Sequence, residues 1–91
     1  MDVVIYTDWE FINKSTTALQ DVMMGIKVIG NLPNKSVAGD RLYLATEDMI
    51  IGSFEIRSIS ESKIHFITNT WQEIGQEISV TPFSGYKYKW W

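Results

Sequence analysis

Hydrophobic residues in this chain occur in short runs separated by polar turns. The run VVIY at residues 3–6 is rich in β-branched side chains, as expected of a strand. RLYLAT and MIIGSFEIRSI, joined by the dipeptide ED, predict a β-hairpin in which Ile50, Phe54 and Ile56 share one face. Gly52 lies between them and favours a bulge or a close backbone contact. The predicted strands are residues 3–6, 26–30, 41–46, 49–59 and 64–68, with shorter ones at 77–80 and 86–91.

One segment has helical periodicity. NKSTTALQDVMMG at residues 13–25 predicts a short helix that has Ser15 as its N-cap and ends at Gly25. The apolar face of this helix comprises Ala18, Leu19, Val22 and Met23. With about six short strands and one helix, the fold class is α+β, mainly β. We expect a single domain over residues 1–91, in which a small curved sheet closes toward a β-barrel and the helix covers one opening.

The charge balance limits what the chain can bind. It has 8 basic and 11 acidic residues and a net charge of −3, so nucleic-acid binding would depend on a local group of cations. The chain has no cysteine, which excludes disulfides and cysteine-ligated zinc. Asp2 and the lack of a long apolar run argue against a signal peptide or a membrane helix. We therefore expect a cytoplasmic protein with no membrane partner.

Three consecutive segments carry a family resemblance. MMGIKVIG at 23–30 ends the predicted helix, VAGDRLYLA at 37–45 has a GD turn before a strand, and MIIGSFEIRSI follows at 49–59. Over about residues 16–60 the chain resembles the PUA-like superfamily, and within it the ASCH domains. The resemblance implies a PUA-like β-barrel with a cleft between the helix and the strands. Relatives bind RNA, modified bases or nucleosides, and some small ASCH proteins hydrolyse acylated cytidines.

The resemblance also implies what a hydrolase would need. The ASCH hydrolase pattern has a lysine after the helix, a threonine three residues later, a nearby arginine and a distant glutamate. Lys27 matches the lysine, but Gly30 occupies the threonine position and Leu32 that of the arginine. These departures favour a binding module, and we assign no catalytic residue, cofactor or metal. A nucleoside amidohydrolase of ASCH type remains an alternative.

Five residues are candidates for ligand binding. Lys27 could hold a phosphate or carbonyl in the cleft, although the helix dipole also favours a solvated lysine near a helix C-terminus. Trp9 and Trp71 could stack on a base, as aromatic residues of related domains do, or could pack at the rim or in the core. Arg41 and Tyr43 open the strand after the GD turn and could line the same cleft. The expected ligand is a nucleobase, a nucleotide or an RNA segment.

Other polar residues favour structural positions. Glu55 alternates with buried neighbours in its predicted strand, which places it on an exposed sheet face. His65 lies on an outer strand face for the same reason. Glu73 and Glu77 have helical spacing, but Gly75 between them indicates a loop or a single turn.

The C-terminal segment GYKYKWW alternates aromatic and basic residues. In a strand, Tyr86, Tyr88 and Trp90 would face inward and the two lysines between them outward. Because this pattern separates rings from cations, we interpret the segment as a strand that closes the core, with Trp91 on the lysine face. The many aromatic residues also suit an interaction protein. A homo-oligomer, or an inhibitor with a protein partner, is therefore a further alternative.

Overall fold

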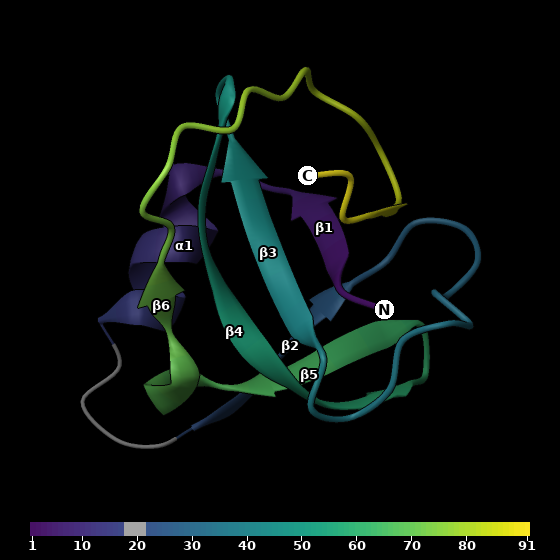
Figure 1. Cartoon of the computed structure of the whole chain (residues 1–91). Helices are drawn as coiled ribbons and strands as arrows, with labels where there is room; N and C mark the ends of the chain where they lie inside the picture. Colours follow the sequence, from purple (N-terminus) through teal and green to yellow (C-terminus); the bar gives the residue numbers. More distant parts are fainter. Residues whose placement is uncertain (18–21) are drawn as a thin grey trace.

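The computed structural model describes residues 1–17 and 22–91, and these residues form a mainly β fold with one α-helix (Figure 1). The strands are β1 (Val3–Tyr6), β2 (Met23–Lys27), β3 (Arg41–Thr46), β4 (Met49–Ser60), β5 (Lys63–Ile67), β6 (Gln72–Glu73) and β7 (Lys87–Tyr88). The helices are α1 (Trp9–Thr16) and the short 3-10 helix η1 (Thr68–Thr70). Ala18 and Leu19, two members of the predicted helical face, lie outside the described residues. The predicted mainly β fold with one short helix is confirmed.

The strands form one sheet in the order β2-β5-β4-β3-β1-β7, and β6 pairs with β4. β1 is parallel to β3, whereas β2 and β5, β5 and β4, and β4 and β3 pair antiparallel. Across the described ranges the sheet does not close into the expected barrel, because β2 and β7 stand at opposite ends of the strand order. No helix in these ranges is long and apolar enough to cross a membrane.

The 12-residue strand β4 belongs to both halves of the sheet. Its first part, Met49–Glu55, pairs with β3, and its last part, Ile56–Ser60, pairs with β5. A register shift between Ile56 and Ser58 marks an irregularity soon after the strand changes partner. Figure 1 shows β5 crossing the lower end of the β3–β4 pair, so the sheet curves around one face.

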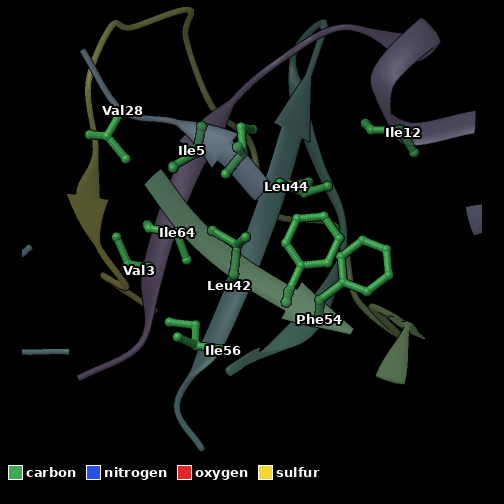
Figure 2. Packing of buried hydrophobic residues seen from close by; sticks show 11 residues of the cluster. Val3, Ile5, Ile12, Val28, Leu42, Leu44, Phe54, Ile56 and Ile64 are labelled. Carbon is green, nitrogen blue, oxygen red and sulfur yellow. The ribbon is translucent and has the colours of Figure 1, made fainter. Parts of the chain in front are cut away.

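Buried aliphatic side chains from β1, β3, β4 and β5 form the main core, which also contains Ile12 of α1 (Figure 2). The rings of Phe54 and Phe66 stack inside it with their centroids 4.3 Å apart. Both side chains are fully buried. Burial of a side chain of this size contributes roughly 1.5–3 kcal/mol. The pair therefore joins β4 to β5 at the point where the sheet curves.

The helix begins earlier than the sequence pattern predicts. Asp8 is the N-cap, and its carboxylate accepts a hydrogen bond from the Phe11 N–H at 2.8 Å. Ser15, the predicted N-cap, is buried inside α1, where its hydroxyl donates to the Phe11 carbonyl at 2.8 Å. Gly25, predicted to end the helix, lies in β2. The prediction of a helix over 13–25 is wrong at both ends. Asp8 caps a helix that begins at Trp9, and pairing with β5 makes the end of the predicted segment part of the sheet.

The predicted GD turn before β3 is confirmed and is held by the start of the chain. Gly39 has a φ of 97°, a conformation that favours glycine. The Asp40 carboxylate accepts hydrogen bonds from the Met1 ammonium at 2.7 Å and from the Val37 N–H at 2.9 Å. The ammonium first, and then the backbone N–H, lower the pKa of Asp40. These bonds hold the beginnings of β1 and β3 together.

Candidate functional site

The structure distributes the five predicted ligand-binding residues over β2 (Lys27), α1 (Trp9), the position after η1 (Trp71) and β3 (Arg41 and Tyr43). Lys27 is the last residue of β2, where it lies exposed opposite Lys63 of β5. It follows no helix, so the expected position after a helix C-terminus is wrong. A helix dipole therefore does not stabilise the charge of Lys27.

Trp9 is the first residue of α1 and is 41% exposed. Its indole Nε1–H donates to Glu47 Oε1 at 3.0 Å. Glu47 belongs to the turn between β3 and β4, and its carbonyl accepts the Tyr6 hydroxyl at 2.7 Å. Trp9 therefore ties the start of the helix to this turn.

Trp71 packs on the main core. Its ring centroid lies 4.8 Å from that of Phe54. Its indole also covers the backbone of Gly52, since a Cβ added there would lie 2.5 Å from Trp71 Cζ2 and 2.6 Å from the Gln72 carbonyl oxygen. The close contact predicted at Gly52 is confirmed, and Trp71 fills the space that the glycine leaves.

The guanidinium of Arg41 is hydrogen-bonded to the protein's own backbone and to a side chain. Its Nε donates to Ser53 Oγ at 3.0 Å, and its Nη2 donates to the carbonyls of Ser53 and Thr70 at 2.9 Å each. The guanidinium thus joins β3, β4 and η1. These three bonds give Arg41 a structural role.

Tyr43 belongs to an aromatic cluster near the end of the chain. Its ring meets that of Trp91 edge-on with centroids 5.0 Å apart, and Lys89 Nζ lies 5.4 Å from each centroid. Trp91 also meets Trp90 edge-on at 5.1 Å. Tyr43 and Trp91 pack against a second, smaller core, formed by Val4, Ala45, Ile50 and Val80. This cluster adjoins the candidate site, because Trp91 contacts Trp90, which lines it.

The candidate site is an open groove of about 490 Å³, which we call the C-terminal groove. Its lining residues are Asp48, Ser79, Val80, Thr81, Lys87 and Trp90. One side is held together by the Val80 N–H, which donates to the Asp48 carbonyl at 2.9 Å, and by a bridge between Met49 and Ser79. On the other side, β7 pairs with β1. Figure 1 shows the yellow-green end of the chain arching over β3 and returning beside β1.

Lysines and rings meet in this part of the molecule. Lys87 Nζ lies 4.9 Å from the ring centroid of Phe83 and 6.0 Å from that of Trp90, which is 47% exposed. Cation–π contacts at exposed positions contribute roughly 0.5–1 kcal/mol each. The prediction that strand alternation separates rings from cations is therefore wrong for Trp90, whereas Tyr86 packs against the main core as the alternation predicts. The reason is that β7 ends at Tyr88, so the alternation stops before Trp90.

The predicted strand at residues 77–80 is also absent as a regular strand. Ser79 forms only an isolated bridge with Met49, and flanking backbone bonds run between Ile50 and Ile78 and between Val80 and Asp48. The sequence signal for Lys87 and Trp90 was the aromatic–basic alternation of the C-terminal segment. No local pattern identifies Asp48 or Thr81, because only the tertiary fold brings them to the groove.

A second depression has different chemistry. It has a volume of about 500 Å³ and lies between Met49–Ile51 and Glu73–Glu77. Its lining has two glutamates and isoleucines but no aromatic ring and no cation, so it suits a base or a phosphate less well than the C-terminal groove. Among residues 1–17 and 22–91, no group of three or more histidine, aspartate or glutamate side chains is placed to hold a metal ion.

Other sequence predictions agree with the structure. Glu55 is exposed on β4, between the buried side chains of Phe54 and Ile56. His65 is half-buried on the outer face of β5, since the core takes Ile64 and Phe66 on either side of it.

Comparisons of the chain with models of known protein families, with curated proteins and with solved structures returned no match, so the functional argument depends on the geometry of the groove.

Proposed function

We propose that this protein is a small binding module that holds the base of a nucleotide, or of a short RNA segment, in the C-terminal groove. One observation carries the proposal: the exposed indole of Trp90 and the ammonium of Lys87 line the same groove. Proteins that bind single-stranded nucleic acid combine such rings with nearby cations, because every base has a face that can stack.

Each lining residue has a role in this proposal. The base stacks on Trp90, a contact that contributes roughly 1–3 kcal/mol per base. Lys87 attracts a phosphate. Asp48 accepts hydrogen bonds from an amino group on the base, and its charge keeps phosphate on the lysine side of the groove. The hydroxyls of Ser79 and Thr81 offer further donors and acceptors for base or ribose.

The size of the groove and the charge of the chain restrict the ligand. A volume of about 490 Å³ lies within the usual range of small-molecule sites, so one or two nucleotides fit better than a long strand. With a net charge of −3, the protein has few cations for phosphate, and stacking supplies most of the affinity. We therefore expect weak dependence on salt.

The PUA-like resemblance implies the same class of ligand, but our proposal places it at a different position. Of the five candidate residues, Tyr43 is linked to the groove through Trp91, whose ring contacts both Tyr43 and the lining residue Trp90. Lys27 lies exposed on the outer strand β2, so we do not extend the proposal to hydrolysis at this lysine.

A binding titration with two matched tryptophan variants tests the proposal. The unchanged protein is titrated by calorimetry with the four ribonucleoside monophosphates and with short single-stranded RNA. Trp90→Ala should weaken binding by at least about tenfold, the loss of one stacking contact. Trp9→Ala, which removes an indole of similar exposure at α1, should leave affinity unchanged. Absence of binding to the whole panel, or equal losses in both variants, would contradict the proposal.

A further inference from the structure

β2 is an edge strand of the sheet. It pairs with β5 on one side and with no strand of the described chain on the other. The Thr68 N–H donates to the Val22 carbonyl and the Val28 N–H to the Ser62 carbonyl, so residues 22 and 28 direct their backbone groups toward the β5 side. By alternation, Met24 and Ile26 do the same. The backbone groups of Met23, Gly25 and Lys27 therefore point away from the sheet.

The outer face of this edge has a distinct pattern of side chains. Met23, which is 60% exposed, lies opposite Ile67, and Lys27 lies opposite Lys63. These are non-hydrogen-bonded pairs, in which the Cα atoms of opposite residues are only about 4.5 Å apart. Two like charges in this position destabilise a sheet. Within residues 1–17 and 22–91, neither Lys27 nor Lys63 forms an ion pair with a carboxylate, so the two like charges at this end of the edge are not neutralised by one.

The inner face of the edge is apolar. Ile26 is buried in the main core, and Met24 packs against that core while remaining partly exposed. The side chains on one face of an added strand would cover Met24 and extend the layer that covers the core.

We propose that β2 receives an extended segment of a partner protein as an additional antiparallel strand. The segment carries a carboxylate opposite Lys27, where it contacts both lysines, and an apolar residue opposite Met23. The backbone groups of Met23, Gly25 and Lys27 supply the hydrogen bonds, and the side chains supply the specificity, as in other cases of strand addition. This interaction is separate from the C-terminal groove and does not depend on the function proposed there.

The charges distinguish this partner from a second copy of the chain. If two β2 strands paired antiparallel around Gly25, Lys27 of each would lie opposite Met23 of the other. That arrangement brings no carboxylate to Lys27 and Lys63. A partner with an acidic residue at one end and an apolar residue at the other is complementary to the whole edge.

The test uses a fluorescein-labelled peptide with the central sequence Glu-Val-Thr-Val-Leu. In an antiparallel alignment its glutamate lies opposite Lys27, its threonine opposite Gly25 and its leucine opposite Met23, while both valines face inward. A second peptide has lysine in place of the glutamate. Fluorescence anisotropy should show saturable binding of the glutamate peptide and at least about tenfold weaker binding of the lysine peptide.

A charge-reversal variant distinguishes binding at the β2 edge from non-specific attraction between the peptide and the protein. Lys27→Glu should weaken the glutamate peptide by at least about tenfold and reverse the preference in favour of the lysine peptide. Lys14→Glu, which makes the same change at an exposed position of α1, should alter neither. Met23→Pro should abolish binding of either peptide, because proline removes an outward N–H, with circular dichroism showing that the fold is kept. If Met23→Pro prevents folding, Lys63→Glu takes its place as the second variant.

Four results would overturn this proposal. They are no saturable binding of the glutamate peptide, equal binding of the two peptides, equal effects of Lys14→Glu and Lys27→Glu, and light scattering that shows a dimer broken by Met23→Pro. The last result would identify a second copy as the occupant of the edge.

Discussion

The indole of Trp71 occupies the space that any side chain at Gly52 would need. A Cβ at position 52 would lie 2.5 Å from Trp71 Cζ2, a distance that real Cβ contacts essentially never show. Trp71 also contacts Phe54, so a displacement of the indole would disturb the main core. The relationship explains why β4 has a glycine at position 52, between Ile51 and Ser53.

Gly52→Ala should therefore destabilise the protein by about 1–3 kcal/mol, the usual effect of overpacking a core. Gly75→Ala is the matched control, because a Cβ at Gly75 has no neighbour within 4 Å. Denaturation in urea measures both free energies of unfolding. Equal values for the two variants would show that the Trp71 contact is not tight.

Trp90 and Trp91 should differ in what they contribute. Trp91 packs edge-on against Tyr43 beside the second core, so Trp91→Ala should lower the free energy of unfolding by about 2 kcal/mol. Trp90 is 47% exposed, so Trp90→Ala should change stability by less than about 0.5 kcal/mol. Urea denaturation of the two variants measures this difference. A large loss of stability in Trp90→Ala would indicate that Trp90 serves packing rather than binding.

The contribution of Asp40 should depend on pH. Its pKa in the folded protein is lowered, first by the Met1 ammonium and then by the Val37 N–H. The stabilisation is therefore present at neutral pH and is lost as the pH falls through the lowered pKa. Asp40→Asn should reduce the melting temperature at pH 7, and the difference from the unchanged protein should shrink as the pH falls through the lowered pKa of Asp40.

Glu61→Gln, which removes a carboxylate at the exposed turn between β4 and β5, is the control for this experiment. It should show no such convergence at low pH. A difference in melting temperature between Asp40→Asn and the unchanged protein that stays constant from pH 7 to pH 2 would contradict the assignment.

The strands were predictable where the pattern was local. The hairpin of β3 and β4 follows from apolar alternation on both sides of a two-residue turn, and this signal does not depend on distant residues. The sequence pattern predicts a strand only from Ile26 and assigns residues 23–25 to the end of a helix, whereas pairing with β5 makes all of Met23–Lys27 a strand. The start of the helix was missed because Asp8, rather than Ser15, caps its N–H groups.

The candidate site was less predictable than the fold. The C-terminal segment alternates aromatic and basic residues, but its regular strand ends at Tyr88, and the two tryptophans after it leave the ladder. Asp48 reaches the groove through a backbone bond to Val80, which is 32 residues later in the chain and has no sequence signal for this contact. A site assembled from such distant segments follows from the tertiary fold alone.

The affinity for RNA should depend only weakly on salt concentration. Lys87 lines the C-terminal groove and lies 6.0 Å from the ring centroid of Trp90, and Lys89 Nζ lies 5.4 Å from that of the neighbouring Trp91, so each can contact one phosphate of a bound RNA. Two phosphate contacts with single-stranded RNA give a slope of about −1.4 for the logarithm of affinity against that of salt concentration. Lys87→Gln should reduce the slope by about half, and Lys14→Gln on α1 should not change it. A much steeper slope would point to a binding surface with many more cations.

The indole N–H signals of the four tryptophans test the central claim most directly. In a nuclear magnetic resonance titration with the tightest-binding nucleotide of the panel, each signal is assigned by single substitution to phenylalanine. We predict that the Trp90 signal shifts saturably, that of Trp91 follows to a smaller extent, and those of Trp9 and Trp71 stay in place. Shifts confined to Trp9 or Trp71, or no shift at saturating nucleotide, would contradict binding in the C-terminal groove.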